Sequence, residues 1–370
     1  MPQPRKCATS RMALWRPLAF ALGSEMNGKG INYDTGFFSA GTTTHEPFDS
    51  EAVRHDLRVI RNELHCTAVR ITGGGTDRLE TAAKHAADAG LAVWLCPFTN
   101  GLSIDELLDL LADCATRAER LRRGGADVVM LTGSEVSLFT LGFFPGDTLD
   151  ERMSIIADPK RVRAAIPAVR AHMSEFLRRA VQLVRARFAG TVSYASLPFE
   201  AVDWNLFDII ATDAGYRTAA LAPTFRDQIR AFVAHGRALG KPVAVTEFGC
   251  ATYRGAGDLA SRTVVGPVEY ENGRPTRIGG EYVRDEHEQA RYISELLDIF
   301  ESEGVDHVFV YTFARFDLPH RKEPRNDLDV ASCGIVKVLD DVRGVGVVRE
   351  TDRRWEPKAA FTALARRYAR

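Results

Sequence analysis

Short apolar segments and longer amphipathic segments alternate eight times along the chain, and this alternation limits the fold more than any other feature. The apolar segments are rich in β-branched and aromatic side chains and are bounded by turn residues. Such segments are typical of strands that are buried on both faces of a parallel sheet. The predicted strands are 30–33, 68–72, 92–96, 128–132, 191–195, 208–212, 243–246 and 307–312.

The segments between these strands have the apolar period of amphipathic helices. In 50–64, for example, Leu57 and Ile60 fall on one helical face. Asp49 or Ser50 precedes this helix as its N-cap. Several segments end directly before a glycine, which accepts the left-handed conformation that terminates many helices. The predicted helices are 50–64, 77–89, 103–123, 160–188, 224–239, 285–303 and 358–369.

Strands that alternate with helices of ten or more residues predict β-α-β units and a parallel sheet. Eight such units favour a closed barrel over an open sheet. We therefore predict an α/β protein with a single (β/α)8 TIM barrel over residues 28–370, preceded by an N-terminal extension, 1–27. Part of this extension resembles a weak signal peptide, but Arg16 and Pro17 interrupt its apolar core. We expect it to pack beneath the barrel.

Three connections depart from a regular barrel. Only the residues 196–207 separate the fifth and sixth strands, so the fifth helix is predicted to be a stub near 199–204. Segments 136–159 and 251–282 are longer than a barrel requires, and they follow the C-terminal ends of the fourth and seventh strands. Long loops without structure of their own are usually functional or mobile. We expect both to lie over the barrel mouth and to limit access to it.

The composition excludes several classes of partner. The chain is 45% hydrophobic and 26% charged, as is usual for soluble globular proteins. A net charge of -1 provides no attraction for nucleic acid or for an anionic membrane. No apolar run approaches the roughly 18–20 residues that span a bilayer.

The six cysteines lack metal-type spacing, so we predict reduced thiols and a cytoplasmic protein.

Polar side chains gather at the C-terminal ends of the predicted strands, the face on which barrel enzymes build their active sites. Glu135 follows the fourth strand, and Glu247 follows the seventh. Arg70 lies within the second strand. These residues converge on one mouth if the barrel closes. The further candidates for substrate binding are Asn32, Asp34, Ser134, Asp213, Tyr216 and Arg315.

Two carboxylates on opposite sides of a barrel mouth match what glycoside cleavage requires. One carboxyl must donate a proton to the leaving oxygen, and the other must be ionised to attack or stabilise the reacting carbon. Arg70 is expected to keep Glu247 ionised, and Tyr216 to fix its rotamer through a hydrogen bond. Glu135 precedes Val136 and other apolar residues, so we expect burial to raise its pKa.

Structural roles for the same residues stay open as alternatives. An acidic residue after a strand is often a helix N-cap or an ion-pair partner. Asp34, Asp213 and Tyr216 suit structural hydrogen bonds as well as the wall of a site, and Trp94 is most simply a core residue. No HExxH or paired histidine spacing is present, so we predict no metal site. The glycines of 73–75 lack the phosphate-loop lysine and indicate a tight turn, so no cofactor is predicted.

The pattern resembles the clan A glycoside hydrolases, barrels that carry catalytic glutamates on strands four and seven. VAVTEFG is similar to the clan's nucleophile strand, which carries over onto Glu247, and LTGSE resembles the acid/base strand, which carries over onto Glu135. AVRIT resembles the second strand, whose arginine supports the nucleophile, and this maps to Arg70. WNLFDIIATDAGY resembles the connection and sixth strand that end at Tyr216. CGIVKVLD followed by WEPKAAF is similar to the clan's ending, so the resemblance covers 28–361.

The sequence departs from the clan's pattern after the fourth strand and at the end of the eighth. Ser134 stands where the clan usually has the asparagine that contacts the sugar hydroxyl next to the reacting carbon. Thr312 and Phe313 stand where a tryptophan commonly ends strand eight. GKGINYDTG and LHCTAVRITG also resemble a group of bacterial barrel proteins labelled abortive infection proteins, a label that implies no particular chemistry.

Three hypotheses follow. The first is a retaining glycoside hydrolase or transglycosidase that acts on a glycoside or another small molecule, with Glu247 as nucleophile and Glu135 as acid/base. The second is a lyase, cyclase or isomerase that uses the same carboxylates for proton transfer. The third is a non-catalytic binding or phage-defence barrel. None of the three sets an oligomeric state.

Overall fold

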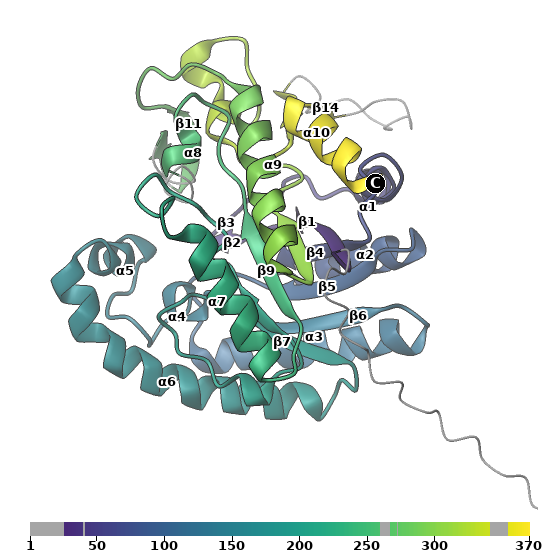
Figure 1. The fold of residues 1–370 in the computed structure, drawn as a ribbon, viewed down its shortest axis with the longest axis vertical. Coiled ribbons are helices and arrows are strands. Elements are labelled where there is room, and N and C mark those ends of the chain that lie inside the picture. Colours follow the sequence, from purple (N-terminus) through teal and green to yellow (C-terminus); the bar gives the residue numbers. More distant parts are fainter. Residues whose placement is uncertain (1–25, 40, 260–266, 272, 341–353) are drawn as a thin grey trace, which may run out of the picture.

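The computed structural model describes residues 26–39, 41–259, 267–271, 273–340 and 354–370. Eight parallel strands close into a barrel in the order β1-β12-β9-β8-β7-β6-β5-β4 (Figure 1). They are β1 (Gly28–Asp34), β4 (Ala68–Gly73), β5 (Ala92–Pro97), β6 (Val128–Ser134), β7 (Thr191–Ser196), β8 (Ile210–Thr212), β9 (Val243–Phe248) and β12 (His307–Val310). The predicted (β/α)8 TIM barrel is confirmed. Of the predicted extension, residues 1–25 lie outside the described part of the chain.

Helices cover the outside of the barrel (Figure 1). They are α1 (Ser50–Asn62), α2 (Thr76–Asp88), α3 (Ile104–Arg123), α6 (Pro159–Arg185), α7 (Phe225–Ala238), α9 (Glu286–Glu303) and α10 (Ala359–Tyr368). Asp49 caps α1 by accepting from two backbone N–H groups, and Gly304 ends α9 in the left-handed conformation. The predicted stub is a 3-10 turn, η1 (Trp204–Leu206). None of the described helices is long and apolar enough to cross a membrane.

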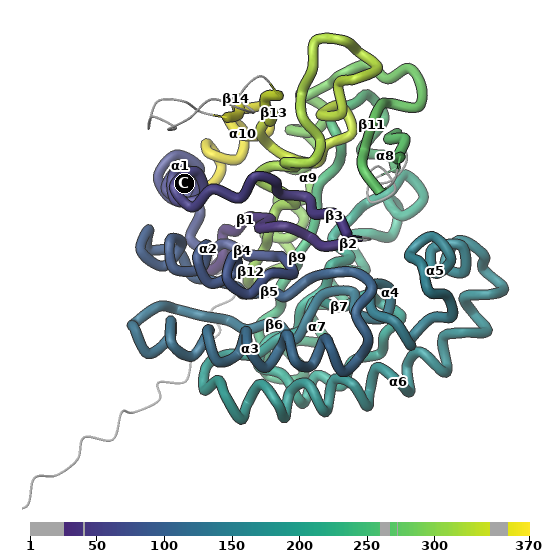
Figure 2. The backbone as a smooth tube through the Cα atoms, turned by 180° about the vertical axis from the view of Figure 1, so that it is seen from behind, coloured from purple at the N-terminus to yellow at the C-terminus, as the bar shows by residue number. Residues whose placement is uncertain are grey.

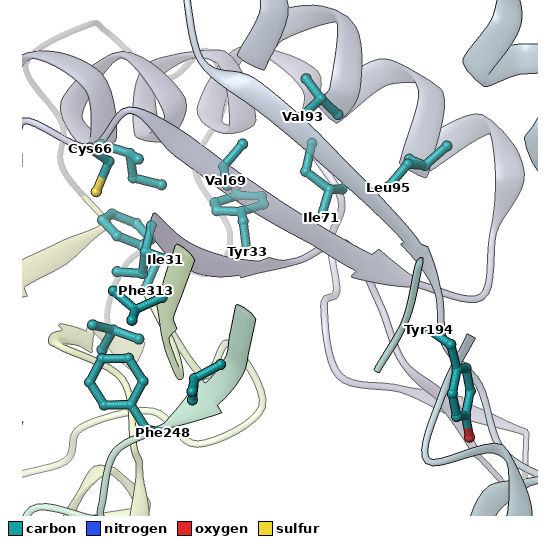
Figure 3. Packing of buried hydrophobic residues seen from close by; sticks show 14 of the residues in the cluster. Ile31, Tyr33, Cys66, Val69, Ile71, Val93, Leu95, Tyr194, Phe248 and Phe313 are labelled. Carbon is teal, nitrogen blue, oxygen red and sulfur yellow. The ribbon is translucent and has the colours of Figure 1, made fainter. Parts of the chain in front are cut away.

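Strand side chains alternate between the barrel interior and the layer beneath the helices. The outward-facing strand residues pack in the helix layer; Figure 3 shows among them Ile31, Val69, Ile71 and Val93. Trp94 packs with Phe309 and other apolar side chains inside the barrel, so its predicted role as a core residue is confirmed. Toward the C-terminal ends of the strands the interior becomes polar. Arg70 there pairs in register with Asn32 of β1.

Both long segments contain secondary structure that their sequence did not reveal. The first forms α4 (Val136–Phe139) and α5 (Leu149–Ile156). The second forms α8 (Ala256–Leu259) and an antiparallel hairpin of β10 (Val268–Glu271) and β11 (Arg274–Ile278). Figure 1 and Figure 2 both place α4, α5, α8 and β11 at one end of the barrel.

Contacts identify this end as the C-terminal one. Arg152 of α5 donates to Asn100, which follows β5. Val268 and Ile278 of the hairpin pack against Leu318, which follows β12. The described parts of both segments therefore lie at the C-terminal end of the barrel, among the loops that follow the strands. That they lie over the mouth and limit access to it stays a prediction.

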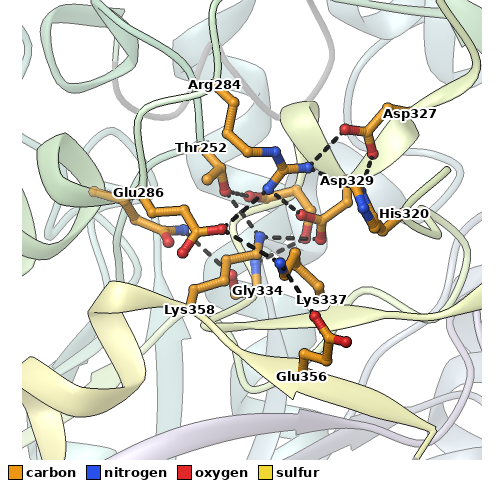
Figure 4. Close-up of polar contacts among 12 residues, drawn as sticks. Thr252, Arg284, Glu286, His320, Asp327, Asp329, Gly334, Lys337, Glu356 and Lys358 are labelled. Carbon is orange, nitrogen blue, oxygen red and sulfur yellow. Dashed lines mark hydrogen bonds and ion pairs between the residues drawn. The ribbon is translucent and has the colours of Figure 1, made fainter. Parts of the chain in front are cut away.

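A network of buried charges joins the loops after β9 and β12 to the start of α10 (Figure 4). The buried Lys358 side chain contacts Asp329 Oδ1 at 3.0 Å and donates to Thr252 Oγ1 at 2.8 Å. Arg284 donates to Asp329 at 2.9 Å and to Asp327 at 2.8 Å. Because ions this deep are costly to leave unpaired, the network holds the loops of the seventh and eighth strands in one arrangement.

Replacing Lys358 with methionine should lower the free energy of unfolding by about 3 kcal/mol, since removing one partner leaves a charge buried. The effect belongs at the low end of its range because Arg284 still pairs with Asp329. Urea denaturation measures it. The exposed Lys322 is the matched control, and its replacement by methionine should change the free energy of unfolding by less than about 0.5 kcal/mol. Equal stability of the two variants would contradict this account of the network.

Candidate active site

Glu247 lies near the end of β9 with its carboxylate held at both oxygens. Arg70 donates to Oε1 at 2.7 Å, and the Tyr216 hydroxyl donates to Oε2 at 3.1 Å. The Arg70 side chain is fully buried, and Glu247 is 7% exposed. A cation on one oxygen and a hydroxyl on the other define the orientation of the carboxylate. The predicted contacts of Arg70 and Tyr216 with Glu247 are therefore present in the structure.

Arg70 also holds a layer of buried polar side chains directly around Glu247. Its Nη1 donates to Asn32 Oδ1 at 3.0 Å and lies 3.3 Å from Asp213 Oδ1. Ser134 Oγ donates to Asp213 Oδ2 at 2.6 Å. The Asn32 amide donates to backbone carbonyls of β9 and β12. Asn32, Ser134 and Asp213 thus have polar atoms engaged within the protein. A direct contact of each with a substrate stays a prediction.

Glu135 directly follows β6, and its backbone has the left-handed angles φ 45° and ψ 38°. It occupies the N-cap position of α4, but its side chain makes no capping hydrogen bond. A non-glycine residue in this region costs roughly 1–3 kcal/mol and is often found at functional sites. The capping role that we kept as an alternative for Glu135 is therefore not performed by its carboxyl group.

The two glutamates differ in how strongly each retains a proton. Burial raises the pKa of Glu247 to about 7, the charge of Asp213 adds to this, and Arg70 opposes it. Burial raises the pKa of Glu135 well above its ordinary value, with further contributions from Asp213 and Glu247. Arg70 thus acts in the predicted direction on Glu247, although burial outweighs it. Because Arg70 directly contacts only Glu247 of the pair, Glu247 ionises first and Glu135 keeps its proton.

A second polar group lies at the ends of β1 and β12. Asp34 accepts from the Gly36 N–H at 2.9 Å and from the Thr44 hydroxyl, and burial raises its pKa to about 6. Arg315 donates through Nε and Nη2 to both oxygens of Asp317, at 2.8 and 2.7 Å. The charge of Arg315 acts to lower the pKa of Asp34, but the structure gives neither residue a direct contact with Glu247.

Sequence reasoning missed the residues behind Glu135. Tyr194 and Glu200 are fully buried and bind the chain that follows Glu135. Tyr194 lies within β7, and Glu200 lies in the loop that follows it. The only signal in the sequence was an acidic residue in the short connection between the fifth and sixth strands.

Among the described residues, no group of three or more His, Cys, Asp or Glu side chains is arranged to hold a metal ion.

Comparisons with known proteins bear on the fold. No family model matches the sequence, and no curated protein matches it. A GH113 beta-mannanase from Alicyclobacillus acidocaldarius, in complex with ManMIm, has a TM-score of 0.57 and 15% identity, covering 92% of this chain and 97% of the mannanase chain. Thermotoga maritima Cel5A, in complex with mannotriose, has a TM-score of 0.44 and 12% identity, covering 83% of this chain and 96% of that one. The mannanase match confirms the resemblance to glycoside hydrolase barrels of clan A at the level of the fold.

Proposed function

We propose that this protein is a retaining glycoside hydrolase or transglycosidase, with Glu247 as the nucleophile and Glu135 as the acid/base. The observation that carries the proposal is the unequal pair of carboxyl groups at the C-terminal end of the barrel. Glu247 is held at both oxygens by Arg70 and Tyr216, whereas Glu135 is buried among negative charges. Two carboxyl groups whose environments separate their pKa values suit the roles of nucleophile and proton donor.

The fixed orientation of Glu247 supports attack on a sugar carbon. A nucleophile that is already oriented avoids much of the entropic cost of reaching the reactive geometry. Arg70 stabilises the ionised carboxylate, and Tyr216 leaves the other oxygen with a single neutral donor. The raised pKa of Glu135 supports its role as proton donor, because a carboxyl group must be protonated near neutral pH to protonate a leaving oxygen.

A panel of aryl glycosides tests the proposal, with product anomers followed by NMR. Retention should appear as a first-formed product with the anomeric configuration of the substrate. Retention requires carboxyl groups about 5–5.5 Å apart, a separation that leaves no space for water between nucleophile and sugar. Inversion would remove the nucleophilic role of Glu247. Turnover of no glycoside, although ligands raise the melting temperature, would favour the binding hypothesis.

The rate should depend on pH as a bell-shaped curve. Glu247 must be ionised to attack, and because its pKa is raised to about 7, its active form is present above that pH and lost as the pH falls through it. Glu135 must be protonated, so the rate falls again at higher pH, where it loses its proton. The value of kcat/KM measured from roughly pH 5 to 10 reports both limbs. A rate that only decreases from pH 5 upward would contradict the assignment of roles.

Two observations favour a second candidate, proton transfer by a lyase, cyclase or isomerase. A carboxyl group with a pKa near 7, as for Glu247, suits a general base at neutral pH. Ser134 is also bound to Asp213 rather than directed at a sugar. This candidate predicts incorporation of solvent deuterium at carbon in the product. The glycosidase proposal predicts none.

We further propose that the protein works in the reducing cytoplasm. No disulfide joins any of the five cysteines in the described part of the chain, and all five are buried. Burial raises the pKa of the Cys66 and Cys114 thiols, which keeps them protonated and unreactive. Mass spectrometry of the protein isolated with a thiol-blocking reagent tests this, because a native disulfide would contradict it.

A further inference from the structure

The backbone N–H groups that follow Glu135 need hydrogen-bond acceptors, and the Glu135 side chain does not provide them. The left-handed conformation of Glu135 is followed by α4, which has four residues, and the first N–H groups of a helix have no partner within it. Glu135 makes no side-chain cap. Buried N–H groups without acceptors destabilise a fold, so residues elsewhere must accept from Val136 and Ser137.

Tyr194 and Glu200 accept from these two groups. Val136 N donates to the Tyr194 hydroxyl at 3.0 Å, and Ser137 N donates to Glu200 Oε1 at 3.2 Å. The Ser137 hydroxyl donates to the same oxygen at 2.6 Å. The Tyr194 hydroxyl and Leu197 N donate to Glu200 Oε2 at 2.9 and 2.7 Å. Both oxygens of Glu200 thus accept two hydrogen bonds each, which favours the ionised form.

The other end of α4 is held separately. Buried Arg152 of α5 donates through Nε to Leu138 O at 2.7 Å and through Nη1 to Gly146 O at 3.0 Å. A carboxylate at the start of α4 and a guanidinium at its end both satisfy backbone groups that the helix itself leaves free. The turn at Glu135 is therefore bound on both sides, and only the start is held through a buried acid.

We propose that Glu200 is a positioning residue, which acts through Tyr194 and Ser137 to hold the turn that presents Glu135 and which places a buried carboxylate next to that turn. This inference rests on the proposed role of Glu135 as acid. Two features of Glu200 support this positioning role. Its carboxylate is fully buried with no cationic partner among its hydrogen bonds, and all four of its donors lie in β7, in the loop after it, or directly after Glu135.

The electrostatics agree with this geometry. Burial raises the pKa of Glu200 to about 7, while its hydrogen bonds from Ser137 and Leu197 act in the opposite direction. The charge of Glu200 is one of the influences that raise the pKa of Glu135. The four hydrogen bonds that the Glu200 carboxylate accepts favour its ionised form. Removal of the Glu200 charge should therefore lower the pKa of Glu135.

The substitution Glu200→Gln tests this without any substrate. Carbon-13 NMR of glutamate-labelled protein, with the Glu135 signal assigned from Glu135→Gln, follows the carboxyl group directly. Glu135 should titrate at lower pH in Glu200→Gln than in the wild type. The matched control is Glu119→Gln, since Glu119 also accepts a backbone N–H, from Ala189, but at the opposite end of the barrel. An unchanged Glu135 titration in folded Glu200→Gln would overturn the proposal.

If Glu200→Gln does not fold, the variant Tyr194→Phe tests whether the turn at Glu135 is held by these hydrogen bonds. It removes the acceptor for Val136 N but keeps the ring and the Glu200 charge. Its crystal structure should show residues 135–137 displaced, and an unmoved turn would overturn the proposal. On a glycoside substrate, kcat should fall at least about tenfold with little change in KM, because small misplacements of a catalytic group are costly. If no glycoside is turned over at all, the proposed function fails, whereas the titration and the crystal structure still judge the role of Glu200.

Discussion

Replacing Glu247 with glutamine should abolish turnover of every glycoside substrate. The amide cannot form the covalent glycosyl intermediate that retention requires. We expect kcat/KM to fall by at least about 1,000-fold, which corresponds to roughly 4 kcal/mol of transition-state stabilisation. The side chain keeps its shape, so the fold should persist. The amide oxygen can accept from Arg70, and the amide nitrogen can donate to Tyr216 if that hydroxyl rotates.

The comparison for this variant is Glu303→Gln. Glu303 binds Arg226 and Arg230 at the end of α9, near the start of β12 and so at the opposite end of the barrel. The Glu303→Gln variant should retain the wild-type kcat/KM. Circular dichroism and melting curves establish that both variants are folded. Full activity of Glu247→Gln would remove the glycosidase hypothesis and leave proton transfer or binding.

Glu135→Gln should show a loss that depends on the leaving group. A poor leaving group needs a proton from Glu135 as the bond breaks, whereas an activated aryl group leaves with little protonation. We expect a loss of about 100-fold or more on unactivated glycosides, within the range usual for general acid catalysis. Formation of the glycosyl intermediate from aryl glycosides should change much less. Steady-state and pre-steady-state rates on a series of leaving groups measure the difference.

The same variant provides its own control, because both substrate types are measured with one protein. The basic limb of the pH profile should also disappear in Glu135→Gln, since that limb reports loss of the Glu135 proton. Equal losses on activated and unactivated substrates would contradict the role of Glu135 as acid. So would a basic limb that stays at the wild-type pH.

Much of the architecture could be predicted because its causes are local in the chain. The alternation of apolar and amphipathic segments determined the number and order of strands. Side-chain caps such as Asp49 and glycines such as Gly304 determined where helices begin and end. Barrel topology then brings the C-terminal ends of all strands to one face, so Arg70 could be expected near Glu247 although 176 residues lie between them.

Secondary structure in the long segments could not be predicted with the same success. The α4 helix has four residues, too few to show an apolar period, and α5 has eight. Short helices have little stability of their own and depend on tertiary contacts. Arg152, which provides such contacts for α4, looks in the sequence like any other arginine of a polar helix.

The sequence by itself determined the barrel and the two glutamates at its C-terminal end, because hydrophobic period and strand order are properties of the chain. Only the tertiary structure decided what the surrounding polar groups bind. Asn32 and Ser134 look like substrate ligands in the sequence, yet their polar atoms are used by Arg70, Asp213 and backbone carbonyls. No motif or spacing in the sequence identifies Glu200 as part of the site. The hydrogen bonds of a buried polar group depend on distances between segments far apart in sequence, and folding alone sets those distances.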